Sequence, residues 1–288
     1  MISIIICSRT PFISTDLIEN INHTIGVQYE LICVDNSKDT YSIFSAYNEG
    51  VKRSQFDILC FMHDDINFKS NNWGISVINR FKSLKLGAIG VAGAPYYAIL
   101  PGAWWSSGYI CQSVFGEQAL AYQAKNDNAL PVVVLDGLWF CVRKSLFSMI
   151  RFDDETFNGF HYYDMDISLQ IHQQGYDILN VYDIAIKHSS GKLDTIWLKN
   201  ALLLQKKWQK SLPASITKIS YFKEVTIEYA VLEEYIHSMK KNGVNQFDII
   251  QFSLKQLVNY RLKRFKLSFP FIFTYLVMRY LLKKLHLR

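Results

Sequence analysis

A histidine and two aspartates follow directly after an apolar run in the first quarter of the chain. The stretch FMHDDINF (61–68) places His63, Asp64 and Asp65 at the end of the run FDILCFM (56–62). Carboxylate oxygens and imidazole nitrogens are metal ligands, and both groups also take part in proton transfer. A solvated acidic loop is the third possibility, and these residues alone leave all three open.

The apolar runs before such polar residues are typical of strands buried on both faces. Four runs without polar alternation lie at 2–7, 30–35, 56–62 and 87–93. Segments of helical length separate them, at 14–25, 41–54 and 72–84. This alternation predicts an α/β fold with a mostly parallel sheet flanked by helices. Ligands bind beyond the carboxyl ends of such strands, which is where Asp35 and Asp65 lie.

The rest of the chain is less regular and then becomes helical. Residues 95–109 predict a loop, and 131–147 predict two strands joined by a turn. A helix over 164–176 and a strand over 178–190 follow. Further helices are expected at 195–210, 221–241, 246–262 and 269–286. The interruption SLPAS indicates a domain boundary near residue 212, which gives domains 1–212 and 213–288.

Two enzyme classes use residues of these types. Asp35 closes the second strand, where dinucleotide-binding folds hold a ribose, but the turn CSRTPF (7–12) has no glycine, so we exclude an NAD site. His63, Asp65 and the distant His188 match the two histidines and one carboxylate of non-haem iron oxygenases. Those sites usually lie in a double β-sheet, whereas this chain alternates strand and helix. The oxygenase remains an alternative.

A series of motifs resembles family 2 glycosyltransferases, which have the nucleotide-sugar-binding GT-A fold. ISIIICSR, YELICVDNSKD and AYNEGVKRSQFDILCFMHDDINF resemble its first strand, its strand-closing aspartate, its Asn-x-Gly helix and its Asp-x-Asp motif. FNGFHYYDMDISLQIHQQGYDI and VYDIAIKHSSG resemble its acidic motif before a helix and its closing strand with a histidine. The resemblance covers about residues 1–210. It implies a GT-A-type, Rossmann-like domain, a helical C-terminal extension and sugar transfer with inversion.

The resemblance also implies a divalent cation, Mn²⁺ or Mg²⁺, that neutralises the donor diphosphate as a Lewis acid. Asp65 and His188 are the implied metal contacts. His63 stands where the family usually has the first aspartate of Asp-x-Asp, so it is a departure and a third candidate ligand. The residues implied to bind the nucleotide sugar are Ser8, Arg9, Asp35, Asn48 and Asp64. Among these, Asp35 would face the base and Asp64 the ribose.

Transfer needs a base that removes the proton of the acceptor hydroxyl, and a carboxylate is the usual choice. The resemblance implies Asp164 for this role, although Tyr163 precedes it where the family often has glutamate. Weaker candidates for contact with the acceptor are Asp136, Trp105, Trp139 and His161. The departures at His63 and Tyr163 leave open a non-catalytic, membrane-docked scaffold that binds sugar.

The charge is distributed unevenly along the chain. Residues 1–248 hold 22 basic and 25 acidic groups, whereas the remaining residues hold nine Lys or Arg and no acid. The tail 261–288 combines cations with an apolar stretch too short to span a bilayer, so we expect contact with an anionic membrane surface. A helix packed on the domain with a basic exposed face is the alternative. No recognition motif indicates nucleic acid. Five scattered cysteines and no signal-peptide pattern predict a cytoplasmic protein.

Overall fold

The structure is a computed structural model that describes residues 1–108, 110–112, 114–115, 129–188 and 193–264. It separates into two compact units, Met1–Ser238 and a second unit that begins at Met239. The predicted helix at 269–286 and most of the predicted tail lie outside the described residues. The predicted domain boundary near 212 stays a prediction, and the division between the two units falls later, within a helix.

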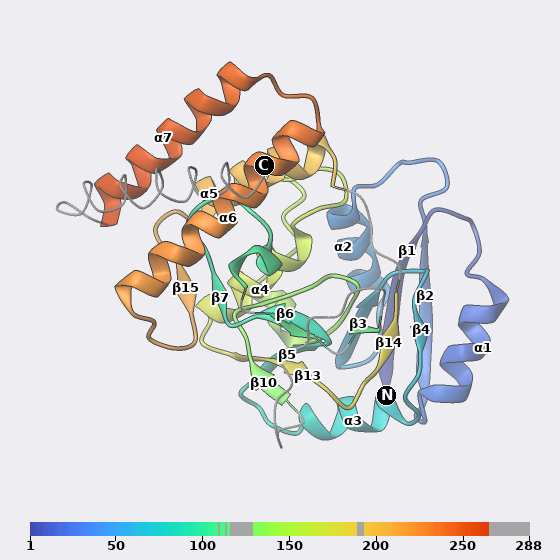
Figure 1. The fold of residues 1–288 in the computed structure, drawn as a ribbon. Helices are drawn as coiled ribbons and strands as arrows, with labels where there is room; N and C mark the ends of the chain where they lie inside the picture. Colours follow the sequence, from blue (N-terminus) through green and yellow to red (C-terminus); the bar gives the residue numbers. More distant parts are fainter. Residues whose placement is uncertain (109, 113, 116–128, 189–192, 265–288) are drawn as a thin grey trace. The chain divides into compact units, whose positions relative to one another are not determined.

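A seven-stranded sheet forms the centre of the first unit (Figure 1). Five of its strands run in one direction and two run against them. The five are β1 (Ile2–Ser8), β2 (Tyr29–Asp35), β3 (Ile58–Met62), β5 (Leu86–Gly90) and β13 (Asp177–Val181). The two antiparallel strands are β10 (Ala129–Pro131) and β12 (Trp139–Arg143). The order β10-β13-β5-β12-β3-β1-β2 confirms the predicted mostly parallel α/β sheet.

Short strands add three small sheets around this centre. They are β4 (Asn67–Phe68) with β14 (Ile186–Lys187) and β9 (Val114–Phe115), β6 (Ala92–Ala94) with β8 (Cys111–Gln112) and β11 (Val134–Leu135), and β7 (Tyr96–Tyr97) with β15 (Ala214–Ser215). The segment predicted as a loop at 95–109 therefore holds a short strand and a 3₁₀ turn, Trp104–Ser107. A second 3₁₀ turn, Lys144–Ser148, follows β12.

The helices lie close to their predicted positions. They are α1 (Thr15–Thr24), α2 (Ile43–Arg53), α3 (Trp73–Arg80), α4 (Tyr163–Gln173), α5 (Thr195–Trp208), α6 (Tyr221–Lys241) and α7 (Gln246–Arg264). The side chains of Ser14, Ser42 and Asp194 accept backbone N–H groups at the starts of α1, α2 and α5. Such caps satisfy donors that have no partner within a helix, and so they fix where each helix begins.

The helices cover both faces of the central sheet. On one face, Tyr47 of α2 packs against Phe61 of β3 and against Tyr163 at the start of α4. On the other face, Trp73 of α3 packs edge to face on Trp139 of β12, and its indole N–H donates to the Thr24 hydroxyl of α1. The β3 strand is buried throughout, which explains why its sequence shows no polar alternation.

The candidate residues gather at one edge of the sheet because of strand register. Ser8, the last residue of β1, pairs with Asp35, the last of β2, and β3 ends beside them. The antiparallel β12 begins where β3 ends, since Trp139 pairs with Met62. The turn before β12 therefore lies at the same edge. These pairings bring segments far apart in sequence to the carboxyl ends of the parallel strands.

Most of helix α6 belongs to the first unit and is held there by buried polar contacts. Glu228 is fully buried, and its carboxylate accepts the N–H groups of Ile99 and Leu100 and the hydroxyl of Tyr96. Tyr235 donates its hydroxyl to the carbonyl of Leu198 on α5. These contacts tie residues beyond 212 to the sheet domain, which explains why the division between the units falls at 238.

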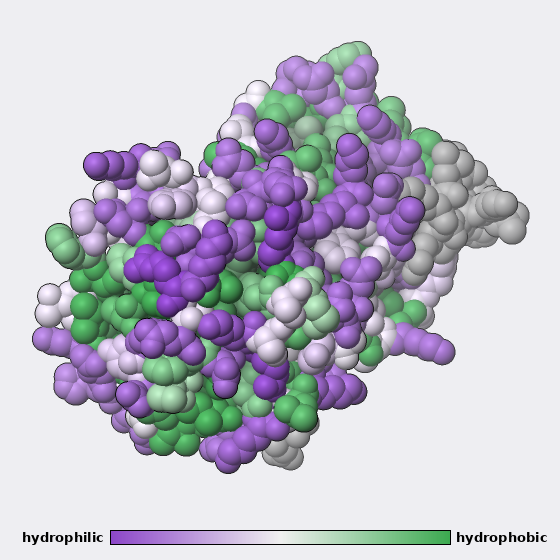
Figure 2. Space-filling model, turned by 180° about the vertical axis from the view of Figure 1, so that it is seen from behind, coloured by the Kyte–Doolittle hydropathy of each residue, from purple (hydrophilic) through white to green (hydrophobic). Residues whose placement is uncertain are grey.

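The surface carries hydrophobic residues in separate patches among hydrophilic ones on the face shown in Figure 2. Among the described residues, none of the helices combines the length and the apolar character that crossing a bilayer requires. On α7 in the second unit, four large apolar side chains are exposed: Phe247, Ile250, Leu254 and Val258. Their spacing places them on one side of that helix.

Candidate active site

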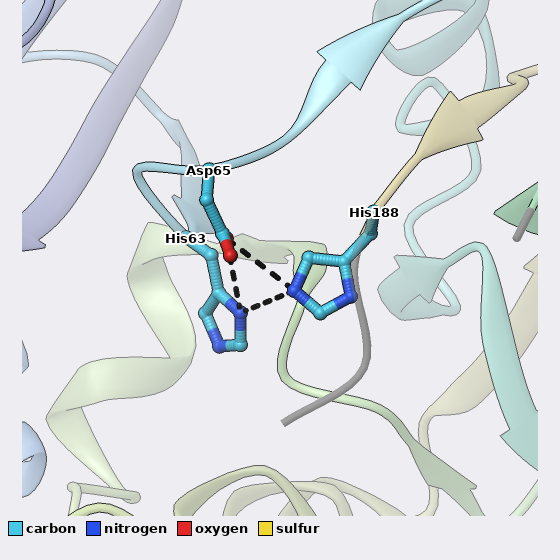
Figure 3. Close-up of side chains that lie close together, drawn as sticks. All are labelled: His63, Asp65 and His188. Atoms are coloured by element: carbon cyan, nitrogen blue, oxygen red, sulfur yellow. Dashed lines mark hydrogen bonds and ion pairs between the residues drawn. The ribbon is translucent and has the colours of Figure 1, made fainter. Parts of the chain in front are cut away.

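Two histidines and an aspartate point toward one another at the carboxyl edge of the sheet (Figure 3). Nδ1 of His63 lies 3.2 Å from Nε2 of His188, and that nitrogen lies 3.3 Å from Oδ1 of Asp65. The third distance, from His63 Nδ1 to Asp65 Oδ1, is 3.9 Å. The three residues offer one ligand atom each within a space of 4.8 Å. We refer to them as the His-Asp-His cluster.

Strand pairing brings the cluster together. His63 directly follows β3, and its backbone N–H donates to the carbonyl of Leu138 just before β12. Asp65 lies two residues before β4, and β4 pairs with β14 so that Lys187 lies opposite Asn67. His188 follows Lys187 directly, so this register places its ring beside the aspartate.

The electrostatics of the cluster favour a carboxylate between two imidazoles. The hydrogen bond from His188 holds the pKa of Asp65 below its ordinary value. Burial opposes the charge on His188, but the hydrogen bond to Asp65 and its charge outweigh burial, so the pKa of His188 is raised. Burial lowers the pKa of His63. At neutral pH, therefore, the carboxylate is ionised and the His63 ring is neutral.

The other ring nitrogen of His63 contacts Tyr163. Nε2 of His63 lies 3.0 Å from the Tyr163 hydroxyl oxygen, and that hydroxyl donates to the carbonyl of Gly137 at 3.0 Å. Tyr163 is 3% exposed, and its ring packs edge-on against Phe44 and Tyr47. Tyr163, the first residue of α4, thus contacts the His63 ring at the nitrogen that does not face Asp65 and His188.

Asp164, the candidate base, is the next residue along α4. One carboxylate oxygen accepts the N–H of Gly137 at 2.8 Å, and the other accepts the N–H of Met165. Burial, with a smaller contribution from the charge of Asp136, raises the pKa of Asp164 to about 8. A carboxylate with so high a pKa is a strong proton acceptor once it has ionised.

Asp136 lies in the turn between Asp164 and the cluster. Its oxygens accept the indole N–H of Trp104 at 2.9 Å and the backbone N–H of Leu138. Its negative charge raises the pKa of His188 and that of Asp164, so it acts on both parts of the site. Trp105, next to Trp104, is partly exposed, and the two rings meet edge to face.

A second polar group lies beside the cluster at the end of β1. The Ser8 hydroxyl donates to Asp64 at 3.2 Å, and the Arg9 guanidinium lies 4.0 Å from the same carboxylate. Asp35 adjoins Ser8 through strand pairing, and its side chain accepts the N–H of Ser37. That hydrogen bond lowers the pKa of Asp35. The structure thus brings Ser8, Arg9, Asp35 and Asp64 to one place.

The cluster and its surroundings fall within the part of the chain that matches a known family. Residues 3–202 match the model of the family described as "Glycosyltransferase like family". This chain belongs to the glycosyltransferase-like family. No curated protein matches it.

Solved structures share the fold of this glycosyltransferase-like protein at low identity. The structure of GalNAc-T7 with UDP, GalNAc and Mn²⁺ matches with a TM-score of 0.50 and 11% identity. The match covers 73% of this chain and 49% of that one, so the chain spans about half the length of GalNAc-T7. Together with the sheet, this likeness confirms the GT-A-type fold. The mannosyltransferase PcManGT from Pyrobaculum calidifontis, with GDP-Man and Mn²⁺, matches at a TM-score of 0.49 and 10% identity over 91% of this chain and 81% of that one.

Two predicted site residues of the glycosyltransferase-like protein make their side-chain contacts away from the cluster. The side-chain amide of Asn48 donates to and accepts from the backbone of Phe152, so it fastens a loop to α2. Trp139 is 0% exposed and packs edge-on against Phe68 and Trp73. These contacts argue against the predicted roles of Asn48 in donor binding and of Trp139 in stacking on a sugar.

His161 lies between the site and α5. Its Nε2 is 3.4 Å from Asp194, the residue that caps α5, and burial lowers its pKa. The adjacent Phe160 ring lies 5.3 Å from the His63 ring, so this segment borders the cluster. A contact between His161 and an acceptor stays a prediction.

Sequence reasoning predicted the turn within 131–147 but missed three contacts. They are the bond from Gly137 N–H to Asp164, the bond from the Trp104 indole to Asp136, and the contact of His63 with Tyr163. The sequence did contain an indication of the contact between His63 and Tyr163. Where family 2 glycosyltransferases usually have an acid at the position of His63 and often another at the position of Tyr163, this chain departs at both. The structure shows that the two departures touch each other.

The cluster fits a divalent cation. A cation bound at about 2.1 Å places neighbouring ligand atoms roughly 3.0 to 3.6 Å apart. Two of the three distances in the cluster, 3.2 and 3.3 Å, lie in that range. The longest involves Asp65, whose side chain is 47% exposed and is free to adjust. The donor set therefore suits a metal ion.

Proposed function

We propose that this protein is a metal-dependent, inverting glycosyltransferase that transfers a sugar from a nucleotide-sugar donor. The observation that carries the proposal is the His-Asp-His cluster, which lies at the carboxyl ends of the parallel strands in a chain of the glycosyltransferase-like family. In open α/β sheets, this edge is where ligands bind. The UDP, GalNAc and Mn²⁺ named with GalNAc-T7 belong to that protein and fit the same proposal.

In this proposal His63, Asp65 and His188 hold Mn²⁺ or Mg²⁺ beside the donor diphosphate. The cation supplies Lewis-acid neutralisation of the charge that grows on the leaving nucleoside diphosphate. The buried network beside the cluster orients its ligands, since Tyr163 contacts the His63 ring and Asp136 accepts hydrogen bonds from Trp104 and Leu138. Ligand side chains that are already held in place need not reorganise when negative charge develops on the leaving diphosphate.

The nucleoside part of the donor would bind at the ends of β1 and β2. Asp35 accepts hydrogen bonds from the base, and Asp64 faces the ribose. Ser8 and Arg9 orient Asp64, which they contact directly. The exposed Arg9 guanidinium can swing toward a diphosphate, because its side chain is 85% exposed.

Asp164 is the proposed general base. The acceptor hydroxyl attacks the anomeric carbon, its oxygen forms the new bond, and the bond from that carbon to the diphosphate oxygen breaks. The proton of the hydroxyl passes to Asp164, and a single displacement of this kind inverts the anomeric centre. Trp105 and Asp136 would contact the acceptor sugar, and His161 would lie at its far side, next to Asp194.

The cellular setting is part of the proposal. The acceptor would be a glycan or a lipid-linked sugar in bacterial surface polysaccharide synthesis, on the cytoplasmic side. All five cysteines are free, as a reducing compartment requires. Residues 261–288, together with the exposed apolar side of α7, would contact an anionic membrane surface.

A non-haem iron oxygenase is the second candidate, because two histidines and one aspartate are the donor set of that enzyme class. Membership of the glycosyltransferase-like family favours the transferase. A third possibility, a scaffold that binds sugar without catalysis, requires that the base be inactive.

A panel of nucleotide sugars tests the proposal. Thermal unfolding is measured with UDP-, GDP- and dTDP-sugars, with and without Mn²⁺, and hydrolysis or transfer is followed by release of the nucleoside diphosphate. We expect one donor to raise the melting temperature only when Mn²⁺ is present. No shift with any donor would contradict the transferase. Turnover that depends on 2-oxoglutarate would favour the oxygenase, and donor binding without turnover would favour the scaffold.

A further inference from the structure

The hydroxyl of Tyr163 lies between two groups that differ in whether they can donate a hydrogen bond. On one side is the backbone carbonyl of Gly137, at 3.0 Å, and on the other is Nε2 of His63, also at 3.0 Å. A carbonyl oxygen only accepts hydrogen bonds, whereas an imidazole nitrogen donates or accepts according to its tautomer. The single phenolic hydrogen serves one of these two groups.

The hydrogen available on the Tyr163 hydroxyl indicates which of the two contacts it donates to. If the phenolic hydrogen pointed to His63, the Tyr163 oxygen and the Gly137 carbonyl oxygen would face each other at hydrogen-bond distance with no hydrogen between them. Two buried oxygens in that arrangement repel each other, and the carbonyl would lose this donor. With the hydrogen on the carbonyl, the phenol oxygen accepts from Nε2–H of His63, and both contacts are satisfied.

We infer that Tyr163 is a positioning residue that holds neutral His63 in the Nε2–H tautomer and so leaves Nδ1 unprotonated toward Asp65 and His188. This inference rests on the proposed function only for the identity of what Nδ1 meets, a divalent cation. A metal-ligating histidine typically donates its other ring N–H to an oxygen acceptor, which fixes the ring and its tautomer. Here that acceptor is a phenol, 100 residues away in sequence.

The fit around Gly137 shows why Tyr163 is held in place. A Cβ atom at residue 137 would come within 2.1 Å of the Tyr163 hydroxyl oxygen, so only glycine permits this approach. The Gly137 N–H donates to Asp164, the neighbour of Tyr163 on α4. Two consecutive side chains of one helix therefore bind the N–H and the C=O of one glycine, and they fix the phenol relative to the turn.

The inference explains the paired departures from the family pattern. A histidine at position 63 is a good ligand only when one defined nitrogen is free of hydrogen and aimed at the cation. A tyrosine supplies the required acceptor without a charge.

Nitrogen-15 NMR of the ring nitrogens tests the inference directly. Metal-free protein is measured at a pH where His63 is neutral, and a His63→Asn spectrum assigns the signals. We expect wild type to show the Nε2–H tautomer. In Tyr163→Phe, we expect a shift toward the Nδ1–H form, which donates to Asp65, and a loss of Mn²⁺ affinity of about 10- to 100-fold. The affinity is measured by electron paramagnetic resonance of free Mn²⁺.

Tyr162→Phe is the matched control, because Tyr162 is equally buried and its hydroxyl bonds to the carbonyl of Gly102 instead. That variant should keep the wild-type tautomer and Mn²⁺ affinity. A predominant Nδ1–H tautomer in wild type would overturn the inference, as would a Tyr163→Phe variant that matches Tyr162→Phe in both measurements. If wild type binds no Mn²⁺, the proposed metal dependence fails, and the tautomer measurement still decides the role of Tyr163.

Discussion

Nδ1 of His63 lies 3.2 Å from Nε2 of His188, although 125 residues separate them in the chain. These two ring nitrogens, together with an Asp65 oxygen 3.3 Å from the His188 nitrogen, form a set of ligand atoms that one cation could bind. Without a cation, a proton on His188 provides the link to Asp65, in agreement with its raised pKa. Cation and proton therefore compete for the same position.

Removal of His188 should weaken metal binding. His188→Ala deletes one of three ligand atoms, so we expect the Mn²⁺ dissociation constant to rise at least about tenfold, the lower bound seen when a mere supporting group is lost. Calorimetric titration measures this change. His23→Ala, at an exposed position of α1, serves as the control and should bind Mn²⁺ as wild type does. Equal affinity in the two variants would remove His188 from the site.

The donor set also predicts which metal the site prefers. Two imidazole nitrogens suit Mn²⁺ and other transition ions better than Mg²⁺, which favours oxygen ligands and retains its waters. We expect Mn²⁺ to bind at least about tenfold more tightly than Mg²⁺. Competition of Mg²⁺ against bound Mn²⁺, followed by electron paramagnetic resonance, gives the ratio. Tighter binding of Mg²⁺ would show that the histidines are not ligands.

Replacement of the candidate base separates binding from chemistry. Asp164→Asn retains one carbonyl oxygen as an acceptor for backbone N–H groups but removes the proton acceptor. We expect a loss of about 10²- to 10⁴-fold in kcat, with donor affinity changed less than twofold. Rapid-quench assays and donor-induced melting shifts measure the two quantities. Unimpaired turnover would mean that another group takes the proton.

The raised pKa of Asp164 predicts the shape of the pH profile. A general base acts when deprotonated, so a pKa of about 8 means that kcat/KM rises as pH increases toward 8 and levels off above it. Since the charge of Asp136 contributes to the raised pKa of Asp164, Asp136→Asn should move the rising part of the kcat/KM profile to lower pH. A rise centred at about pH 4, the ordinary range of a carboxyl group, would contradict the environment described for Asp164.

Glu228 predicts a stability effect far from the chemistry. Glu228→Ala removes the acceptor of the N–H groups of Ile99 and Leu100, so we expect a loss of at least about 2 kcal/mol in the free energy of unfolding. Denaturant titration measures it. Glu49→Ala, which removes only a surface pair with Lys52, should cost less than about 1 kcal/mol.

The same residue also gives the stability a dependence on pH. Burial raises the pKa of Glu228 from 4.5 to about 7. The folded state therefore keeps a proton that the unfolded state releases, and the contribution of this residue to stability falls as pH rises from 4.5 to 7. The Ala variant should lack this part of the slope. An unchanged slope would show that Glu228 ionises normally.

Much of the fold could be predicted because the central strands carry a strong local signal. Continuous apolar runs such as the one before His63 are needed only where both faces of a strand are covered, so they indicate a parallel sheet. The caps at Ser14 and Ser42 are likewise local, and α1 and α2 begin where such residues occur. Short strands such as β4 and β7 were missed, since two residues carry no periodicity. The single strand expected over 178–190 holds two short strands, β13 and β14.

The site was predictable only in part. Asp65 and His188 were predicted as metal contacts from motifs that are local in sequence, and the structure brings the two side chains together. That they bind a metal stays a prediction. Asn48 and Trp139 belong to equally suggestive stretches, yet their partners are the Phe152 backbone and the Trp73 ring. A local pattern does not reveal which face a strand residue takes or which distant backbone group an amide meets.

The sequence by itself determined the sheet, its flanking helices and the acidic edge, because hydrophobic periodicity and strand-end position are properties of short segments. Only the tertiary structure decided how His63 is used. Its role depends on strand register, on a glycine at 137 that admits a phenol, and on a helix that starts 100 residues later at Tyr163. Ligand geometry and tautomer are set by such distant contacts, since no local pattern fixes where a ring nitrogen finds its partner.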